Sequence, residues 1–225
     1  MALSKNKKEL NYEEYNILKI LCTNRELNGN VKLSSSEIGQ KVGVSQQTAS
    51  RVLIMLEKHG YINRIAHGRR QYIAIQEKGY DALYEEMAEL SEILGIKQEL
   101  ELRGTITSGL GEGRYYVSKK PYVMEFTEKL GIIPYPGTLN VKILPEEESK
   151  LRTLRARKGI IINGFQADDR TYGDVLAFPC KFKESKCAAI FPIRSVYRDV
   201  IEIISNDFLR EKYSLSNDDR VSIYF

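Results

Sequence analysis

The stretch GVSQQTASRVLIMLEKHG, residues 43–60, decides the fold of the first part of the chain. Gly43 suits the end of one helix, Ser45 can cap the next, and apolar residues then recur at helical spacing as far as Gly60. Just upstream, Ser34–Ser36 offers capping hydroxyls to a short helix that Gly43 would stop. Two short helices joined by a tight turn form a helix-turn-helix motif.

The flanking segments extend this motif on both sides. Residues 12–24 have helical apolar spacing, residues 61–65 and 71–75 have the composition of two strands, and residues 66–70 form a turn between them. Over residues 10–76 this order resembles the winged helix-turn-helix domain of prokaryotic regulators. A second role for such a domain, in protein interaction or dimerisation, remains open.

The resemblance implies binding to double-stranded DNA, with the second helix in the major groove. Glutamine and arginine can make bidentate contacts with base edges, and arginines at the tip of the wing suit phosphates or a minor groove. The candidate DNA-binding residues are Ser45, Gln46, Gln47, Ser50 and Arg51 on the helix and Arg69 and Arg70 on the wing.

The charge of the chain is unevenly distributed. Residues 1–76 hold twelve Lys and Arg against six acidic residues, a net +6, while residues 77–95 carry a net −5 and the remainder +3, which together make the overall +4. A basic first unit fits phosphate contact. Residues 77–94 form an acidic amphipathic helix that should face away from DNA and pack on the winged domain or on a second subunit. A palindromic DNA site would require a homodimer.

After residue 96 the pattern becomes that of short strands separated by turn residues. Many short strands with few helical stretches indicate a compact β-barrel. We therefore expect a multidomain α+β protein, with residues 1–95 as the winged domain and its connecting helix and residues 96–225 as the barrel. The expected strands are Leu100–Thr107, Val141–Leu144, Phe178–Phe182, Ala188–Phe191, Val200–Ile204 and Val221–Phe225.

Three clusters in the barrel carry chemical groups. SGLGEGRYY, residues 108–116, has three alternating glycines that could direct backbone N–H groups at an anion, although a tight barrel turn would use the same residues. In PYPGTLNV, residues 134–141, Thr138 and Asn140 would share one face of a strand and suit Mg²⁺, or simply form a turn and a buried strand position. Glu202 lies among aliphatic residues, where a carboxylate needs a partner unless it is at the barrel rim.

These clusters, in this order and spacing, resemble the archaeal CTP-dependent riboflavin kinases over residues 97–225. The resemblance implies a cradle-loop β-barrel that transfers the γ-phosphate of CTP to the 5′-hydroxyl of riboflavin and yields FMN and CDP. Some members of this family look like regulators of riboflavin genes fused to the kinase, which fits the winged domain here.

The resemblance also implies roles for individual residues. Mg²⁺ would be held by Thr138 and Asn140, and Glu202 would bind the flavin or its ribityl chain and is the candidate general base. The family pattern departs at residues 192–195, where Ser195 stands for a threonine, so that Ser195 or Arg194 would contact the flavin. The implied nucleotide-binding residues are Leu110, Gly111, Glu112, Gly113, Arg114, Tyr115, Asp207, Phe208, Leu209 and Arg210.

Composition excludes several other classes. Three cysteines without a CxxC pair and two histidines supply neither a disulfide framework nor a thiolate or histidine-rich metal centre. No apolar run approaches the roughly 20 residues that cross a bilayer, and no signal sequence is recognisable, so we expect a cytoplasmic protein. The main hypothesis is a riboflavin kinase with a DNA-binding regulatory domain. Two alternatives to it remain: a regulator whose barrel only senses a flavin or nucleotide, and a kinase whose winged domain serves only in assembly.

Overall fold

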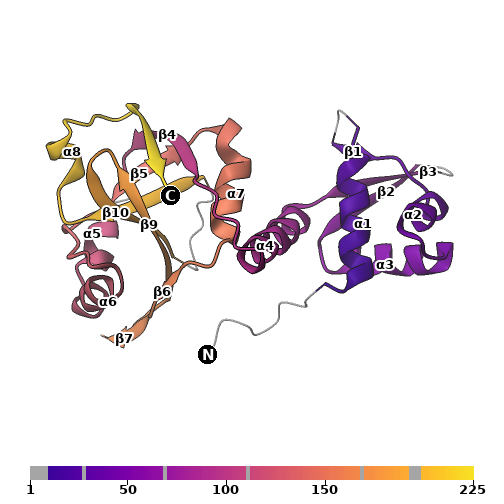
Figure 1. Cartoon of the computed structure of the whole chain (residues 1–225), viewed down its shortest axis with the longest axis horizontal. Coiled ribbons are helices and arrows are strands. Elements are labelled where there is room, and N and C mark those ends of the chain that lie inside the picture. The colour runs from indigo at the N-terminus through magenta and orange to yellow at the C-terminus, as the bar shows by residue number, and fades with distance from the viewer. Residues whose placement is uncertain (1–9, 27–28, 68–69, 110–111, 168–169, 193–198) are drawn as a thin grey trace. The chain divides into compact units, whose positions relative to one another are not determined.

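The computed structural model forms two compact units, residues 1–93 and 94–225 (Figure 1). The residues that the structure describes are 10–26, 29–67, 70–109, 112–167, 170–192 and 199–225.

The first unit is a winged helix, as the sequence predicts. Its three strands form one antiparallel sheet in the order β1-β3-β2, and β2 and β3 pair over their whole length as the wing hairpin. The elements are α1 (Tyr12–Thr23), β1 (Asn30–Val31), α2 (Ser35–Val42), α3 (Gln46–Lys58), β2 (Ile62–His67), β3 (Arg70–Ile75) and α4 (Glu77–Ile93).

Side-chain caps fix the two helices of the motif. The hydroxyl of Ser34 accepts a hydrogen bond from the Glu37 backbone N–H at 3.2 Å, and the Glu37 carboxylate accepts one from the Ser34 N–H at 2.7 Å. Gly43 ends α2 with a φ of 81°, a conformation that favours glycine. The hydroxyl of Ser45 then caps α3 by accepting from the Thr48 N–H at 3.1 Å. These bonds satisfy donors that helix ends otherwise leave unpaired, so the turn is set locally.

The acidic helix α4 packs on this unit through its first half. Tyr80 and Leu83 lie against the winged-helix core, Ala82 is buried, and Gly79 fits where a Cβ atom would collide with the backbone of Tyr61. The helix therefore packs on the winged domain, one of the two partners expected for it from the sequence. The core that it joins contains Ile17, Leu21, Ile38, Val52, Leu53, Leu56 and Ile73.

The second unit is built on a closed sheet. Its strands follow the order β10-β11-β5-β4-β12-β9-β6, all neighbours are antiparallel, and β10 also pairs with β9. That extra pairing closes six strands into a barrel and leaves β6 as an addition to β9. The strands are β4 (Glu101–Thr107), β5 (Leu139–Ile143), β6 (Ile160–Ile162), β7 (Phe165–Ala167), β8 (Arg170–Tyr172), β9 (Val175–Phe182), β10 (Ser185–Pro192), β11 (Val200–Ser205) and β12 (Arg220–Tyr224).

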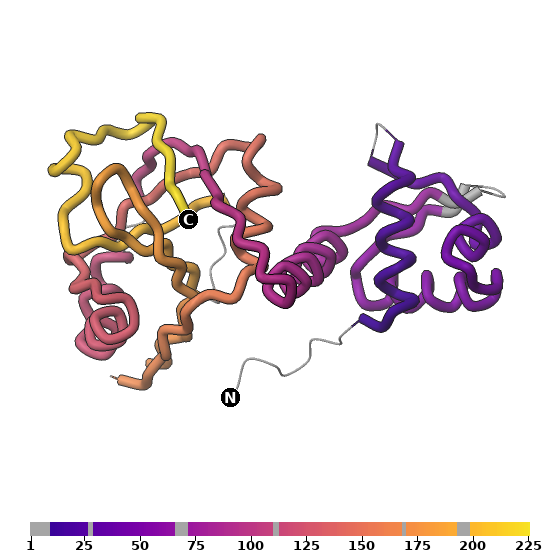
Figure 2. Tube along the Cα trace, in the orientation of Figure 1, coloured from indigo at the N-terminus to yellow at the C-terminus, as the bar shows by residue number. Residues whose placement is uncertain are grey.

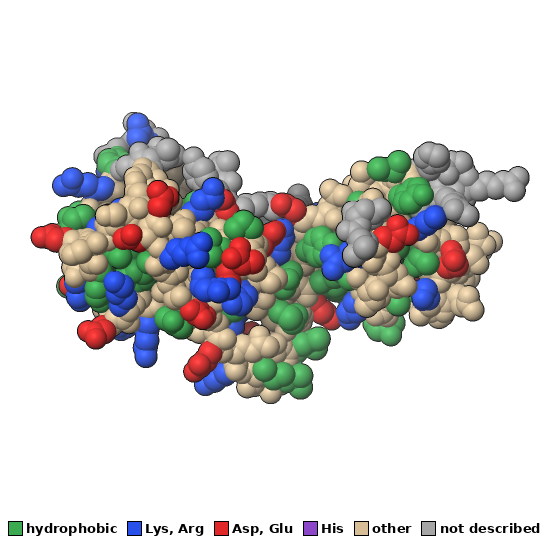
Figure 3. Space-filling view, turned by 90° about the horizontal axis from the view of Figure 1, so that it is seen from above, with side chains coloured by type: hydrophobic (Ala, Val, Ile, Leu, Met, Phe, Trp, Pro, Cys, Tyr) green, Lys and Arg blue, Asp and Glu red, His purple; other side chains and the backbone are tan. Residues whose placement is uncertain are grey.

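Alternate residues of the barrel strands point into one apolar core, as period-two side-chain geometry requires. Leu102, Val141, Ile201 and Ile223 are among its fully buried or nearly buried members. The last strand, β12, pairs with β4, the first strand of the barrel (Figure 2). On the face shown in Figure 3, basic and acidic side chains are interspersed over this unit.

The barrel carries more helix than the strand pattern predicts. In α6, Tyr122, Phe126 and Leu130 recur at intervals of four, and together with Val117 of α5 they form a second apolar cluster against the outside of the sheet. The helices are α5 (Glu112–Val117), α6 (Lys120–Leu130), the 3₁₀ turn η1 (Pro145–Glu147), α7 (Glu148–Ala156) and α8 (Leu209–Lys212). None of the helices in the described ranges is long and apolar enough to cross a membrane.

Candidate active site and candidate nucleic-acid interface

Strand register places three polar residues in one row across the barrel wall. Asn140 of β5 lies directly opposite Thr107 of β4 on one side and opposite Glu202 of β11 on the other. Directly opposed residues on antiparallel strands have Cβ atoms about 4.5–5.5 Å apart on the same face. Their chain neighbours Val141 and Ile201 point into the barrel core, so the polar row faces outward. Residues nearly 100 positions apart thus form one half-buried polar surface.

The glycine segment lies against this row. A Cβ atom on Gly109 would stand 2.5 Å from the amide nitrogen of Asn140, and one on Gly113 would stand 2.5 Å from the hydroxyl oxygen of Thr138. Real Cβ atoms do not approach that closely. Glycine at these two positions therefore lets the backbone approach Thr138 and Asn140, the two residues that the sequence predicts as metal ligands.

Part of the predicted glycine loop is a helix. Residues 112–117 form α5, with Gly113 directed at Thr138. On the same helix the Tyr115 hydroxyl lies 3.1 Å from that of Tyr172, and the amino group of Lys119 stands 4.2 Å from the centre of the Tyr115 ring. The Lys119 ammonium group lowers the pKa of the Tyr115 hydroxyl. Tyr115 thus contacts Tyr172 of β8, whereas the exposed side chain of Arg114 lines a pocket beside Thr138.

That pocket has a volume of about 200 Å³ and opens beside the strand end at Leu139. At its wall Tyr135 stacks on Phe208, with ring centres 4.8 Å apart and planes 14° from parallel. Both rings are partly exposed. The residues that line the pocket are Arg114, Tyr135, Pro136, Gly137, Thr138, Leu139, Ile203, Ser205, Asp207, Phe208, Leu209 and Arg210.

Residues 207–210, which are predicted to bind the nucleotide, all line this pocket, and each side chain has a different environment. Phe208 is exposed in the aromatic pair, while Leu209 is buried in the barrel core. The Asp207 carboxylate accepts a hydrogen bond from the Lys212 amino group at 2.5 Å, and this contact raises the pKa of Lys212. Arg210 donates to the Thr107 carbonyl oxygen at 2.8 Å. The segment is therefore anchored to the strand that leads into the glycine segment.

The residues at Thr138 and Asn140 fit a hard cation. Both side chains carry a neutral oxygen, and Mg²⁺ typically takes few protein ligands and completes its shell with phosphate oxygens and water. The cradle formed by Gly109 and Gly113 brings backbone close to both side chains. Within the described ranges no group of three His, Cys, Asp or Glu residues could hold a metal. His59 instead lies at the end of α3, where its ring nitrogen is 2.7 Å from the Met55 carbonyl oxygen.

Several expected site residues cannot be compared with the structure. Leu110, Gly111, Arg194, Ser195 and Arg69 lie outside the described residues, as do the side chains of Glu112 and Arg70. Conversely, Thr107 and Tyr135 were missed. The signal for Tyr135 was its place between two prolines in residues 134–136, which holds an aromatic ring beside the Gly-Thr turn. Thr107 carries no local signal, because only strand register brings it to Asn140.

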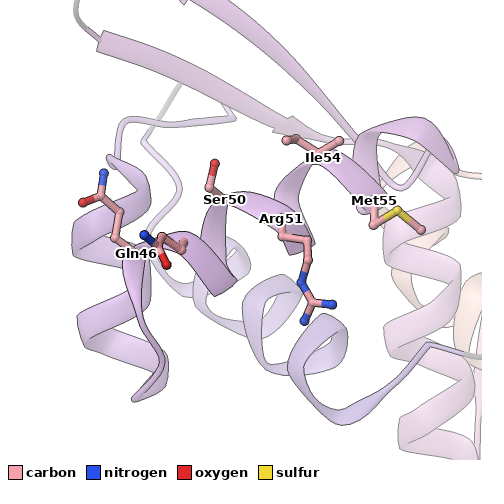
Figure 4. A pocket seen from close by; sticks show the side chains of 6 residues that line it. Gln46, Ser50, Arg51, Ile54 and Met55 are labelled. Atoms are coloured by element: carbon pink, nitrogen blue, oxygen red, sulfur yellow. The ribbon is translucent and has the colours of Figure 1, made fainter.

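The candidate nucleic-acid interface is the outer face of α3. Gln46, Gln47 and Arg51 are exposed there, and Ser50 and Ile54 point to one side of the helix while Arg51 points to the other (Figure 4). Together with Met55 they line a shallow recess. Ser45 is instead engaged as the cap, since its hydroxyl bonds to the N–H and lies 3.0 Å from the hydroxyl of Thr48.

Comparison with known proteins places both units in families. Residues 106–225 match the family model CTP-dep_RFKase, described as "Domain of unknown function DUF120", and residues 10–69 match the model of the MarR family. Among solved structures, the PcaV transcriptional regulator of Streptomyces coelicolor overlaps 39% of this chain and 62% of its own length at 20% identity, with a TM-score of 0.32. The assignment of the winged helix rests on the family match and on the order of its elements.

Relatives aligned over nearly the whole chain carry one name. The chain is 49% identical to the riboflavin kinase of Thermoplasma acidophilum over 96% of its own length and 98% of that protein. It is 50% identical to that of Thermoplasma volcanium, covering 85% and 87% of the two chains, and 40% identical to that of Archaeoglobus fulgidus, covering 94% and 91%. The resemblance predicted from residues 97–225 is thereby confirmed, and the chain belongs to the riboflavin kinase family.

Proposed function

We propose that this protein transfers the γ-phosphate of CTP to the 5′-hydroxyl of riboflavin, giving FMN and CDP, and that its winged helix binds double-stranded DNA. The observation that carries the kinase proposal is the polar row of Thr107, Asn140 and Glu202 under the glycine segment. The chain matches relatives named riboflavin kinase over most of their length, 98% in the case of the Thermoplasma acidophilum protein. A nucleotide phosphate donor and a divalent metal are what this family implies. CTP and Mg²⁺ are the specific choices that we propose.

The pocket supplies the nucleotide site in this proposal. Arg114 and Thr138 both line the pocket, and the exposed guanidinium group of Arg114 can pair with phosphate oxygens. The stacked rings of Tyr135 and Phe208 offer an aromatic face to the base, and such stacking contributes about 1–3 kcal/mol per base. Leu209, whose side chain is buried, can contact the nucleotide only through its backbone.

Thr138 and Asn140 would hold Mg²⁺, which when bound supplies charge neutralisation to the phosphates. Phosphoryl transfer is catalysed mainly by positioning and electrostatics. The chain therefore has to hold the riboflavin hydroxyl in line with the γ-phosphorus atom. The new O–P bond forms as the bond to the β-phosphate oxygen breaks, and CDP leaves.

Glu202 is the residue proposed to take the proton of the 5′-hydroxyl. It lies directly opposite Asn140 on the same face of the sheet, next to the residues that would hold Mg²⁺. A carboxylate within hydrogen-bond reach of a hydroxyl can accept its proton as the transfer proceeds. We also propose that Glu202 binds the ribityl chain. Ser195 or Arg194 would add a flavin contact.

The kinase proposal is tested by following the terminal phosphate of labelled nucleotide. Purified protein is incubated with riboflavin, Mg²⁺ and either γ-labelled CTP or γ-labelled ATP, and FMN is separated and counted. Label in FMN from CTP, and far less from ATP, is expected. Equal transfer from both nucleotides would reject the preference for CTP. Binding of riboflavin without any labelled FMN would favour the alternative, a regulator whose barrel only senses its ligand.

DNA binding is proposed as a second function because a specific surface favours it. The face of α3 presents Gln46, Gln47 and Arg51 to solvent in a unit that matches the MarR family. A palindromic site would engage two copies of the chain. Arg69→Ala combined with Arg70→Ala should weaken binding to every duplex and reduce the slope of log K against log salt by about 2, one for each phosphate that an arginine no longer neutralises. An unchanged affinity and an unchanged salt slope would show that Arg69 and Arg70 do not contact DNA.

A further inference from the structure

The middle of the exposed face of α3 is neutral. Gln47 and Ile54 are seven residues apart and therefore lie about 20° from each other around the helix axis. Both are exposed, Ile54 to 52%, and Ser50 lies beside them on the wall of the same recess. Ile54 does not belong to the core of this unit, so its side chain is available to a partner that docks on the recess.

One of the two cationic side chains of α3, that of Arg51, lines the same recess on the side opposite Ser50. Of the thirteen residues of the helix only Arg51 and Lys58 are basic, and Lys58 is in the last turn. The guanidinium group of Arg51 stands 3.5 Å from the carboxylate of Glu13 in α1, and the side chain points away from Ser50 and Ile54 (Figure 4). Arg51, whose side chain is 73% exposed, therefore flanks the pair of Gln47 and Ile54 on one side while Ser50 flanks it on the other, and the two central side chains are both neutral.

We propose that α3 recognises A·T base pairs in the major groove, with Gln46 or Gln47 bonded to adenine and Ile54 packed on the methyl group of a thymine. This inference rests on the DNA-binding function proposed above. A glutamine amide has one acceptor and one donor group, which match the N6 amino group and the N7 atom of adenine. Guanine presents two acceptors at the same edge, which would leave the amide oxygen without a donor.

The helix geometry also sets the spacing of these contacts. Seven residues of α-helix span about 10 Å, which equals roughly three base-pair steps of 3.4 Å. A helix that lies along the groove would therefore place the adenine read by Gln47 about three base pairs from the thymine under Ile54. The recess between the two side chains receives the intervening base edges beside Ser50.

Selection from a library of random duplexes with the full-length protein tests this inference first. The expected result is an enriched site whose positions under α3 are A·T pairs. Enrichment of G·C pairs at those positions would overturn the inference and leave DNA binding intact. Failure to enrich any duplex would overturn the DNA-binding proposal itself, and the inference with it.

Removal of single groups then tests each contact on the selected site. Replacing each thymine in turn by uracil deletes only the methyl group, and at one position this should lower affinity about fourfold, the effect of one buried methyl group. Ile54→Ala should lower affinity similarly and abolish the difference between thymine and uracil. Gln47→Ala should lower affinity about tenfold.

The matched control is Ile133→Ala, which removes an equally apolar side chain of the barrel that is 63% exposed, and it should leave the affinity for DNA unchanged. If no uracil substitution affects binding, the thymine contact of Ile54 is wrong.

Discussion

The winged helix and the barrel build their functional surfaces in opposite ways. In the winged helix the candidate base contacts come from one short segment, Ser45 and the consecutive turns of α3 as far as residue 54, and only the predicted phosphate contacts of Arg69 and Arg70 come from elsewhere. In the barrel, Thr107, Asn140 and Glu202 come from three strands, and only the pairing of β4 with β5 and of β5 with β11 brings them together. The surface on α3 is therefore determined by neighbouring residues in the sequence, whereas the barrel site depends on the register between strands that are far apart in the sequence.

This difference predicts that mutations in the two units should affect different functions. A change on α3 should affect duplex binding and leave kinase turnover intact, because no candidate kinase residue belongs to residues 1–93. A change in the polar row should abolish turnover without touching DNA affinity. The predictions below test that separation, from the largest expected effect to the smallest.

Asn140→Ala should have the largest effect. It removes a proposed metal ligand and the polar centre of the row, so turnover should fall about 100-fold or more, since even residues that merely support metal ligands often cost 10- to 100-fold. Riboflavin affinity, measured by the change in flavin fluorescence, should stay nearly the same. Asn63→Ala, an exposed strand asparagine of the winged unit, is the control and should keep full turnover. Normal turnover of Asn140→Ala at limiting Mg²⁺ would contradict the ligand role.

Gly113→Ala should reduce kcat/KM for CTP about tenfold. The added methyl group would stand 2.5 Å from the Thr138 hydroxyl oxygen, so that α5 or Thr138 has to shift, and a misplacement of about 1 Å can lower the rate by up to about 100-fold. Gly173→Ala serves as the control, because nothing lies within 4 Å of the Cβ position there. Steady-state kinetics and thermal unfolding of both variants make the comparison. Equal kinetics of the two variants would show that the close approach of α5 to Thr138 is unimportant.

Tyr135→Ala should raise KM for CTP about fivefold, the lower end of what one aromatic stacking contact contributes. Its effect on kcat should be smaller, because the ring is proposed to contact the base and not the transferred phosphate. Tyr12→Ala, in the winged unit, removes another exposed tyrosine and should leave KM unchanged. A raised KM for riboflavin with an unchanged KM for CTP would move the aromatic pair to the flavin site.

The cysteines should show the smallest effect. Burial raises the pKa of the Cys180 and Cys187 thiols in the barrel, so the reactive thiolate form of both is scarce at neutral pH and increases only as pH rises well beyond it. Cys22 of α1 is only half-buried, and its pKa is raised too. Mass spectrometry after mild alkylation at pH 7.5 should find any label on Cys22 first. Faster labelling of the barrel pair would show that the barrel opens more readily than the winged helix.

The sequence predicted the winged helix in detail because its signals are local. Capping serines at positions 34 and 45 and glycines at positions 43 and 60 mark the ends of helices α2 and α3, and the structure has those ends. The strands of the barrel were also located, but α6 and α7 were passed over. Pro121 in the first turn of α6 and Gly131 at its end were available signals for that helix.

The candidate site was predictable only in part. Thr138 and Asn140 could be found because they are two residues apart in the sequence, although the structure places Thr138 directly before β5 and Asn140 within it. The row that Asn140 forms with Thr107 and Glu202 depends on pairings between segments 33 or more residues apart, which no local pattern encodes. The helical form of residues 112–117 was likewise hidden, because the alternating glycines of the segment 109–113 favour a loop on propensity alone. The family resemblance supplied the roles of Asn140 and Glu202, whereas Thr107 was not predicted at all.

The most direct test of the catalytic role of this row is the rate of FMN formation by the full-length protein carrying Glu202→Gln. Glutamine keeps the size and the hydrogen-bonding capacity of the side chain but cannot accept the hydroxyl proton. The rate with CTP at neutral pH should fall about 100-fold, as loss of a general base does, while KM for riboflavin changes little. FMN formation at the wild-type rate would contradict the assignment of catalysis to the polar row.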